Sequence, residues 1–345
     1  MSAESRTLAY VGNADSADIS RVELATDGRL ALLDTTPVPG LTTPGASLPL
    51  ALSPDRSHLY AAVRVEPYAA LTFAIDLATG RLTLAGSAPL PDSMAYISTD
   101  RTGRYLFGAS YGGSRIAVNA VAADGIAGPA LQVEDTAPKA HAIVADPSGR
   151  YVLSASLGGN LVEQWRLDPT TGRLTRNDSA TAAIPAGSGP RHLVFSPDAR
   201  FVYVLGELDA AIHVLPWDPA SGTLGHPLQS IAAVPASFAG QPWAADIHLT
   251  PDGRFLYASE RGSSTLAAFR VDAATGRLTS IGSTPTETQP RGFAISPSGR
   301  YLLAVGQLSN RMTSYAIDQA TGALTPVANL AVGKNPNWIE LITLP

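Results

Sequence analysis

The 345-residue sequence contains no cysteine, so it can form neither disulfide bonds nor thiolate metal sites, and it has no cysteine nucleophile. No apolar run approaches the ~18 to 20 residues of a membrane span. Charged residues make up only 15% of the chain, and the formal net charge is −5. A nucleic-acid-binding protein normally carries a basic surplus. These absences exclude a disulfide scaffold and argue against nucleic-acid and membrane partners.

Lysine is almost absent, because Lys139 and Lys334 are the only two among 24 basic residues. Arginine is therefore the default cation of this chain, and an arginine needs a positional argument before it is assigned a function. The start of the chain lacks the basic residues and apolar stretch of a secretory signal, and strand-like sequence begins at Leu8. We therefore expect a soluble, cytoplasmic protein.

Two turn phrases recur along the chain. The first is Ser-Pro-Asp-Gly-Arg or a relative, followed by an aromatic residue, and the second is Asp-x-x-Thr-Gly-Arg-Leu. Proline presets the backbone of a turn, glycine supplies a positive φ, and Asp or Ser bonds nearby amides. Arginines of the first phrase are Arg104, Arg150, Arg200, Arg254 and Arg300, which lie 46, 50, 54 and 46 residues apart. Each repeat therefore predicts four short strands joined by hairpin turns.

A repeat of about 49 residues divides the chain into seven units, and a propeller blade has ~40 to 50 residues. The sequence thus predicts an all-β, seven-bladed β-propeller with four-stranded antiparallel blades, as a single domain over residues 1–345. The chain opens with the later strands of a blade, at 8–13 and 19–24, and ends in a lone strand from Trp338. Pairing that strand with the N-terminal strands closes the ring. An open β-solenoid is the alternative, and it would leave both ends unmatched.

The blade pattern also predicts which residues meet at the central axis, because innermost strands begin, and second strands end, at one rim. The starts of the seven innermost strands and the ends of the seven second strands make fourteen positions. Four of them are arginines, where chance would place about one. The expected axial residues are Arg64, Arg191, Arg261 and Arg291, with His141, Glu207 and Gln307 at the same rim and Tyr96, His192 and Asp246 one step deeper. Four guanidinium groups focus a positive potential and offer bidentate donors for carboxylate or phosphate. We therefore expect a small anionic ligand in a charged funnel.

Two of these residues are candidates for proton transfer. His141 titrates near neutral pH and could take a proton from water. Glu207 could do the same if burial raised its pKa, or it could orient His141 or an arginine; a purely structural ion pair with Arg261 is the alternative. His192 and Asp246 are candidate supports. Because few carboxylates converge there, we predict no catalytic metal and no cofactor.

Three segments carry a resemblance to a known family. They are Ser-Gly-Pro-Arg-His-Leu-Val-Phe at 188–195, Trp-Ala-Ala-Asp-Ile-His-Leu-Thr-Pro-Asp-Gly-Arg at 243–254 and Thr-Glu-Thr-Gln-Pro-Arg-Gly-Phe at 286–293. They closely resemble the lactonase or cycloisomerase-2 family, which contains bacterial propeller-type 6-phosphogluconolactonases and fungal carboxymuconate lactonizing enzymes. The bacterial branch is the closer match. The resemblance runs from about Leu8 to the final strand.

The resemblance implies hydrolysis of 6-phospho-D-glucono-1,5-lactone to 6-phosphogluconate in the oxidative pentose phosphate pathway. The active residues proposed for the family fall by motif on four positions of this chain: His141, Arg191, Glu207 and Arg261. The chain departs from the bacterial pattern at Gly206, where Asn is common, and at Tyr96, where His is frequent.

On this hypothesis His141, with or without Glu207, is the base, and Arg191 stabilises the oxyanion. Arg64, Arg261 and Arg291 would bind the phosphate of the substrate, and Gln307 would contact its hydroxyls. Tyr96, His192 and Asp246 would also contribute to substrate binding.

Two alternatives stay open at this point. One is a different enzyme of the same family, which lactonises a muconate or opens an unphosphorylated sugar lactone. The other is a non-catalytic propeller that binds partners on its rim, which predicts an exposed apolar patch and no charged site at the axis. We expect a small anionic sugar lactone as the partner, and a monomer or a weak homodimer.

Overall fold

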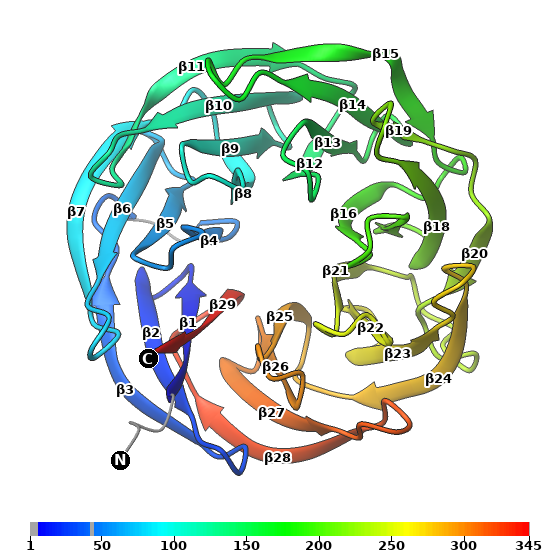
Figure 1. The fold of residues 1–345 in the computed structure, drawn as a ribbon. Coiled ribbons are helices and arrows are strands. Elements are labelled where there is room, and N and C mark those ends of the chain that lie inside the picture. The colour runs from blue at the N-terminus through cyan, green and yellow to red at the C-terminus, as the bar shows by residue number, and fades with distance from the viewer. Residues whose placement is uncertain (1–5, 42–44, 345) are drawn as a thin grey trace.

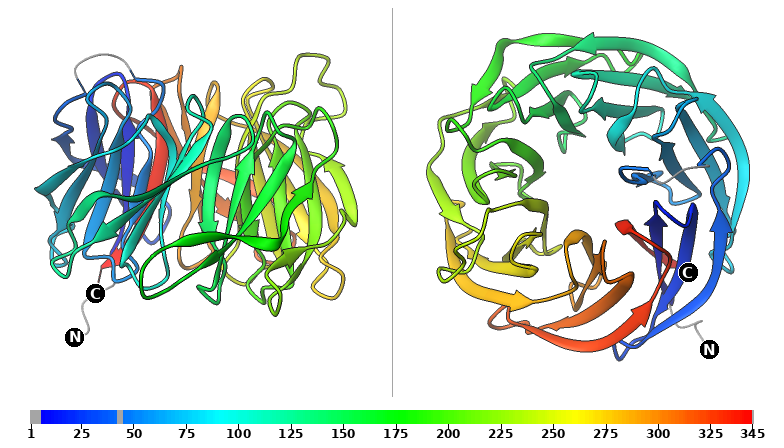
Figure 2. Two further views of the ribbon diagram at one scale, coloured as in Figure 1. Left: turned by 90° about the horizontal axis from the view of Figure 1, so that it is seen from above. Right: turned by 180° about the vertical axis from the view of Figure 1, so that it is seen from behind.

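The described residues form seven antiparallel sheets arranged radially around a central axis (Figure 1). The structure, a computed structural model, describes residues 6–41 and 45–344. The first five residues, which bear on the expectation about a secretory signal, lie outside this range. In six of the seven sheets the strands follow one another in sequence from the axis outward, and in the seventh the last strand of the chain, β29, is innermost (Figures 1 and 2). The predicted all-β, seven-bladed propeller is confirmed.

The strands, blade by blade from the axis outward, are as follows. The first three blades comprise β29 (Pro336–Leu344), β1 (Arg6–Asn13), β2 (Asp18–Leu24) and β3 (Leu30–Pro37); β4 (Leu50–Leu52), β5 (His58–Val63), β6 (Ala69–Ile75) and β7 (Leu82–Pro89); and β8 (Met94–Thr99), β9 (Tyr105–Ser110), β10 (Arg115–Val121) and β11 (Ala127–Asp135). The next two comprise β12 (Ala140–Ala145), β13 (Tyr151–Ser156), β14 (Leu161–Leu167) and β15 (Leu174–Ala183); and β16 (Pro190–Phe195), β17 (Phe201–Gly206) and β18 (Ala211–Asp218), with an outer strand divided into β19 (Thr223–Leu224) and β20 (Gln229–Ala232). The last two comprise β21 (Ala244–Leu249), β22 (Phe255–Glu260), β23 (Thr265–Val271) and β24 (Leu278–Pro285); and β25 (Pro290–Ile295), β26 (Tyr301–Gly306), β27 (Arg311–Ile317) and β28 (Leu324–Ala331).

The ring is closed by the pairing of the two ends of the chain. Strand β29 pairs antiparallel with β1, and Tyr10 lies opposite Glu340 in that register. The last strand of the chain is therefore the innermost strand of the blade whose other three strands are β1, β2 and β3 (Figure 2). This pairing satisfies the backbone groups of the inner edge of β1. The open solenoid is thereby ruled out.

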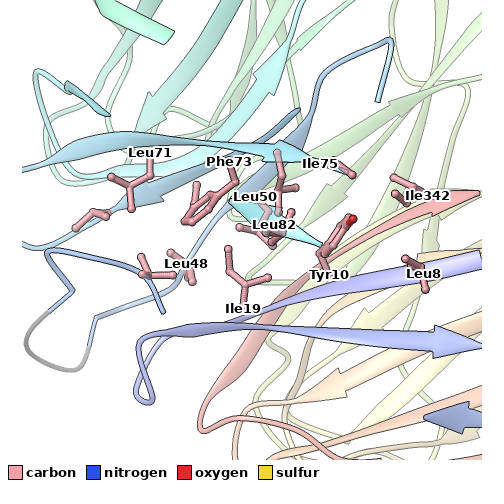
Figure 3. Packing of buried hydrophobic residues seen from close by; sticks show 14 of the residues in the cluster. Leu8, Tyr10, Ile19, Leu48, Leu50, Leu71, Phe73, Ile75, Leu82 and Ile342 are labelled. Atoms are coloured by element: carbon pink, nitrogen blue, oxygen red, sulfur yellow. The ribbon is translucent and has the colours of Figure 1, made fainter. Parts of the chain in front are cut away.

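Apolar side chains between neighbouring blades hold the ring together. Figure 3 shows one such cluster, in which Leu8 and Tyr10 of the first blade pack with Leu50 and Phe73 of the second. The Tyr10 hydroxyl donates to the carbonyl oxygen of Gly80 at 2.7 Å. Gly80 has a φ of +72°, and a Cβ there would lie 2.0 Å from Leu8 Cδ1. The Thr-Gly turn is therefore required both for its backbone shape and for the contact between blades.

The arginines of the Ser-Pro-Asp-Gly-Arg turns also join neighbouring blades. Arg104 donates to the carbonyl oxygen of Pro169 at 2.5 Å, and Arg150 donates to that of Pro219 at 2.6 Å. Their guanidinium groups lie over the rings of the aromatic residues that follow them. These two turn arginines therefore stabilise the contacts between neighbouring blades. Among the described residues, no helix is long and apolar enough to cross a membrane.

β-Bulges at the start of the innermost strands decide which side chains reach the axis. The pairing of β12 with β13 shifts register between Ala140 and Ala142, so His141 is the extra residue. The same shift occurs around Arg191 in β16 and around Arg291 in β25. A bulge re-aims the side chain of its unpaired residue and is common next to functional sites. Three of the predicted axial residues are therefore positioned by the same backbone device.

Candidate functional site

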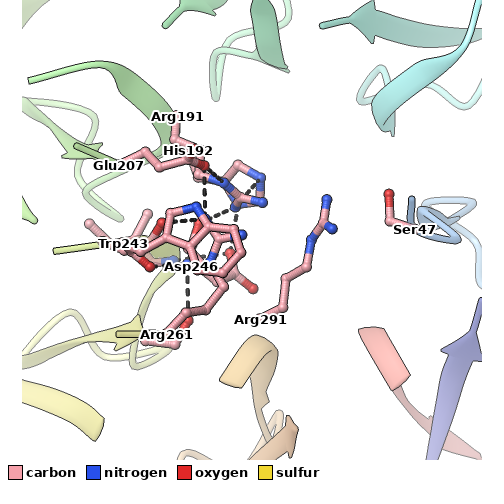
Figure 4. A network of polar contacts seen from close by, with 12 residues as sticks. Ser47, Arg191, His192, Glu207, Trp243, Asp246, Arg261 and Arg291 are labelled. Atoms are coloured by element: carbon pink, nitrogen blue, oxygen red, sulfur yellow. Dashed lines mark hydrogen bonds and ion pairs between the residues drawn. The ribbon is translucent and has the colours of Figure 1, made fainter. Parts of the chain in front are cut away.

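Glu207 lies between two buried arginines near the axis. It follows β17, and its Oε2 accepts from Arg191 Nε at 2.7 Å and from Arg261 Nη2 at 2.9 Å (Figure 4). The side chains of Arg191 and Arg261 are 1% and 4% exposed, so both charges are removed from solvent. Burial alone would raise the pKa of Glu207, but Arg191 and Arg261 outweigh it and hold that pKa below its ordinary value. Glu207 is therefore ionised at neutral pH and is a weak base.

Arg191 is held on two of its three nitrogens. Besides the bond from Nε, its Nη1 donates to His192 Nε2 at 3.0 Å and to the carbonyl oxygen of Ala245. In the described part of the chain, no oxygen accepts a hydrogen bond from Nη2. The guanidinium group is thus fixed in orientation, with one edge left for a ligand. Such a preorganised donor suits a negative charge that develops on an oxygen.

A chain of hydrogen bonds runs from Arg191 through His192 and Asp246 to His248. His192 Nδ1 lies 2.8 Å from Asp246 Oδ1, and His248 Nε2 lies 3.1 Å from Asp246 Oδ2. Burial, followed by the charge of Arg191, lowers the pKa of His192 to about 4. His192 is therefore neutral at pH 7, and its Nδ1–H can donate to Asp246 while Nε2 accepts from Arg191. Burial opposes the charge of His248, but Asp246 outweighs it and raises the pKa of His248.

Arg64 and Arg291 converge on one short segment before β4. Arg64 Nη1 donates to Ser47 Oγ at 2.6 Å, and Arg291 Nη1 donates to the carbonyl oxygen of Ala46 at 2.8 Å. Arg64 Nε donates to Ser93 Oγ at 3.1 Å, whereas Arg291 Nε is buried and has no hydrogen-bond partner in the described structure. Figure 4 shows Arg291 extending from its strand toward Ser47.

Neither of these two arginines forms an ion pair with a carboxylate in the described structure. Within residues 6–41 and 45–344, no ion pair includes Arg64 or Arg291. Burial, followed by repulsion from Arg191, lowers the pKa of Arg64 to about 10 and that of Arg291 well below its ordinary value. Arg64 therefore remains cationic at neutral pH, and a guanidinium group such as that of Arg291 is not deprotonated in proteins. An anion bound here would relieve this repulsion, and arginine pairs bind phosphate well.

His141 lies beside this group of charges. Its ring centroid is 5.4 Å from that of His192 and 5.7 Å from that of Tyr111, both in edge contacts. Burial, followed by repulsion from Arg191, His192 and Arg291, lowers its pKa well below the ordinary 6.5. Its Nδ1 is buried without a hydrogen-bond partner in the described structure. His141 is therefore neutral at pH 7 and able to accept a proton.

The structure brings His141, Arg191, Glu207 and Arg261 together, with Arg64, Arg291 and His192 next to them. Tyr96 and Asp246 instead line a cavity of about 230 Å³ that extends along the inner strands, together with His248, Trp338 and Glu340. Gln307 donates through Nε2 to Asn335 Oδ1 at 2.9 Å, so part of its amide is already engaged.

Sequence reasoning missed several residues of this region. Ser47 and Ser93 fix Arg64, and Trp243 stacks on Arg261, with the guanidinium carbon 3.8 Å from the ring centroid (Figure 4). Trp243 lies directly before an innermost strand, so its place in the repeat was the available signal. Glu340 was also missed, although it lies two residues after Trp338, where the predicted last strand begins. Burial raises the pKa of Glu340 to about 7.

No group of three or more His, Asp or Glu side chains among the described residues could hold a metal ion. The donors that converge near the axis are mainly guanidinium nitrogens, which repel cations. The arrangement instead suits an anionic ligand, with one neutral imidazole and one preorganised guanidinium beside it. It can therefore support proton transfer and the stabilisation of an oxyanion.

Comparisons with known proteins agree with this chemistry. Residues 8–341 match a family described as lactonase with a 7-bladed β-propeller. The chain is 41% identical over 335 residues to a 6-phosphogluconolactonase of Pectobacterium carotovorum, covering 97% of this chain and 98% of that protein. It is 38% identical to a 6-phosphogluconolactonase of Serratia proteamaculans, covering 98% of this chain and 99% of that protein.

A solved structure gives the same relationship. The periplasmic gluconolactonase of Pseudomonas aeruginosa superposes with a TM-score of 0.90 at 30% sequence identity, covering 99% of this chain and 100% of that chain.

Proposed function

The chain belongs to the lactonase family of seven-bladed β-propellers, and from this premise we propose that it hydrolyses 6-phospho-D-glucono-1,5-lactone to 6-phosphogluconate. The relatives of similar length that are named for this activity support the substrate. The observation that carries the proposal is that two arginines without a carboxylate partner, Arg64 and Arg291, lie near a neutral His141 and a fixed Arg191. One ligand can carry both a phosphate, which Arg64 and Arg291 would bind, and an ester. The ester would then lie beside His141 and Arg191.

In the proposed reaction, water attacks the lactone carbonyl carbon. His141 accepts a proton from this water, and the free edge of Arg191 donates to the carbonyl oxygen as it becomes an oxyanion. Such a donor contributes roughly 3 to 4 kcal/mol in other acyl-transfer sites. When the tetrahedral intermediate collapses, the bond from the carbonyl carbon to the ring oxygen breaks, and protonated His141 returns a proton to that oxygen. The product is an open chain with a hydroxyl group and a carboxylic acid, and the acid releases its proton to solvent water to become the carboxylate.

Substrate binding itself would adjust the proton affinity of His141. In the free protein, the charges of Arg191 and Arg291 contribute to the lowered pKa of His141. A phosphate bound to Arg64 and Arg291 would offset part of that positive potential. The pKa of His141 would then move back toward neutral in the complex, which makes it a better base when substrate is present.

Glu207 has a different role in this proposal. Its lowered pKa and its bonds to Arg191 and Arg261 make it the group that orients the two guanidinium groups. It would not take a proton from water. Arg261, which is already paired with Glu207, would contribute less to phosphate binding than Arg64 and Arg291.

A phosphate ester with two negative charges does not cross a lipid bilayer unaided, because charge burial in hydrocarbon is costly. This substrate therefore supports the proposal that the protein acts in the cytoplasm. Fractionation of cells that produce the protein tests this location, and recovery from the periplasm would contradict it.

The second candidate is a hydrolase of unphosphorylated sugar lactones, which the gluconolactonase relative favours. Rates with 6-phosphogluconolactone and glucono-1,5-lactone, each corrected for spontaneous hydrolysis, separate the two. We expect kcat/KM for the phosphorylated lactone to be higher by at least tenfold. The Arg64→Ala variant should remove most of this preference. The Arg104→Ala variant, altered in a turn that joins neighbouring blades, should retain it. Equal rates with both lactones would favour the second candidate.

A further inference from the structure

Trp243 is held in place more firmly than a surface side chain requires. Its backbone nitrogen donates to Glu260 Oε1 at 2.5 Å, and its carbonyl oxygen accepts from Arg261 N at 3.0 Å and Arg261 Nε at 3.1 Å. One face of its indole ring is covered by the Arg261 guanidinium group, 3.8 Å from the ring centroid. The backbone and one ring face are therefore both fixed against Arg261.

The same side chain is nevertheless 39% exposed. Two other tryptophans, Trp165 and Trp217, are buried in the packing between blades. Figure 4 shows Trp243 near the axis in the same close-up as Arg191, Glu207 and Arg291. Tryptophan is enriched at binding surfaces because its ring is large and apolar while its N–H can stay in contact with water. Because the neighbouring groups are charged, Trp243 adds an apolar face to a site that otherwise recognises charge.

We propose that the open face of Trp243 stacks against the C–H face of the substrate's six-membered lactone ring; this inference rests on the proposed function. Such a ring presents polar hydroxyls at its edge and carbon-bound hydrogens on its faces, so an indole can cover the apolar side without competing for hydrogen bonds. The phosphate on Arg64 and Arg291 and the ring on Trp243 would then fix two ends of the substrate, which places the carbonyl carbon near Arg191.

The stacking also distinguishes substrate from product. Ring opening converts a compact, fixed ring into a flexible open chain, which would have to be ordered before it could cover the indole. Trp243 therefore favours the closed lactone over the open acid. This contact does not depend on the phosphate, so the same platform serves phosphorylated and unphosphorylated six-membered lactones.

The test compares Trp243→Leu and Trp243→Phe with Leu308→Ala, a matched change at an exposed apolar residue beyond β26. For Trp243→Leu we expect KM to rise about tenfold with both 6-phosphogluconolactone and glucono-1,5-lactone, and kcat to stay within twofold. Trp243→Phe should recover most of the loss, and Leu308→Ala should change neither constant. If Trp243 only positioned Arg261, kcat would fall and Phe would not rescue it; that result, or an unchanged KM, overturns the inference.

A second measurement does not depend on turnover. Glucono-1,5-lactam, which keeps the six-membered ring, should change the tryptophan fluorescence of the wild-type protein and of Trp217→Phe, but not of Trp243→Phe. If neither lactone is hydrolysed and the lactam signal still depends on Trp243, the proposed function fails while the ring-binding surface stands. If the lactones are hydrolysed and the signal does not depend on Trp243, the inference alone fails.

Discussion

Replacing Glu207 with glutamine removes the carboxylate that lies between Arg191 and Arg261 while preserving the size of the side chain. Glu207 Oε2 is 2.7 Å from Arg191 Nε and 2.9 Å from Arg261 Nη2, and the three side chains are between 1% and 13% exposed. Loss of one partner from a buried ion pair leaves an uncompensated charge and costs roughly 3 to 5 kcal/mol. Because the amide oxygen still accepts one hydrogen bond, we expect a loss of about 3 kcal/mol in the free energy of unfolding, measured by urea titration.

The pH dependence of this loss follows from the pKa of Glu207, which lies below its ordinary value of 4.5. A lowered carboxyl pKa contributes stability above the unfolded-state pKa, and that contribution is lost as the pH falls through the native value. The difference between wild type and Glu207→Gln should therefore be constant from about pH 5 to 8 and should shrink below about pH 4.

The same change should lower kcat/KM on the order of a hundredfold, because Arg191 loses the bond that fixes its orientation toward the oxyanion. The matched control is Glu163→Gln, which alters another buried glutamate that accepts from Ser154 Oγ and lies 3.5 Å from Arg176. That variant should lose stability and retain kcat/KM within twofold. The reasoning is refuted if Glu207→Gln unfolds at the wild-type urea concentration, or if both variants lose activity equally.

Three further predictions concern Asp246, Glu340 and His141. Asp246→Asn should lower kcat roughly tenfold with KM nearly unchanged, because the hydrogen bond that orients His192 toward Arg191 weakens; a change confined to KM would contradict this. Burial raises the pKa of Glu340 to about 7, so this group opposes folding increasingly as the pH rises from its ordinary pKa of 4.5, and fully above pH 7. Glu340→Gln should therefore gain roughly 1 to 3 kcal/mol in urea unfolding at pH 8 and nothing at pH 4, and a loss at pH 8 would contradict the assigned burial. Finally, the acid limb of kcat should lie at higher pH than that of kcat/KM with 6-phosphogluconolactone but not with glucono-1,5-lactone, because only the bound phosphate raises the pKa of His141; coincident limbs with the phosphorylated lactone would show that it does not.

The fold could be predicted because turn chemistry repeats. The Thr-Gly turn around Gly80 needs a positive φ and leaves no space for a Cβ, so where its phrase recurs it marks a blade independently of the strands between. The closure of the ring followed from the unmatched strands at the two ends. The turn phrases are local signals in the sequence that recur along the chain with small variations.

The candidate site was predicted in part. Counting from the turn prolines identified His141, Arg191 and Arg291 as axial residues, although the bulges that re-aim them cannot be read from residue types. The direction of the Glu207 pKa could not be predicted, because it depends on two arginines from different blades outweighing burial. Burial of Glu340 is likewise a product of packing around the axis.

Trp243 shows a second limit of sequence reasoning. The place of Trp243 directly before an innermost strand indicates a position near the axis, but it does not show that the indole ring stacks on Arg261 instead of packing between blades, as Trp217 does. The difference depends on two hydrogen bonds of the Trp243 backbone. Its N–H donates to the side chain of Glu260 at the end of β22, and its carbonyl oxygen accepts from the side chain of Arg261. Such contacts become visible only when neighbouring strands are placed in register.

The most direct measurement is a crystal structure of the protein with 6-phosphogluconate bound. The account predicts phosphate oxygens within hydrogen-bond distance of Arg64 and Arg291, and the carboxylate at the free edge of Arg191 beside His141. A ligand seated instead in the cavity of Tyr96 and Glu340, or on the outer strands, would contradict the central claim that the arginines at the axis bind and position the substrate.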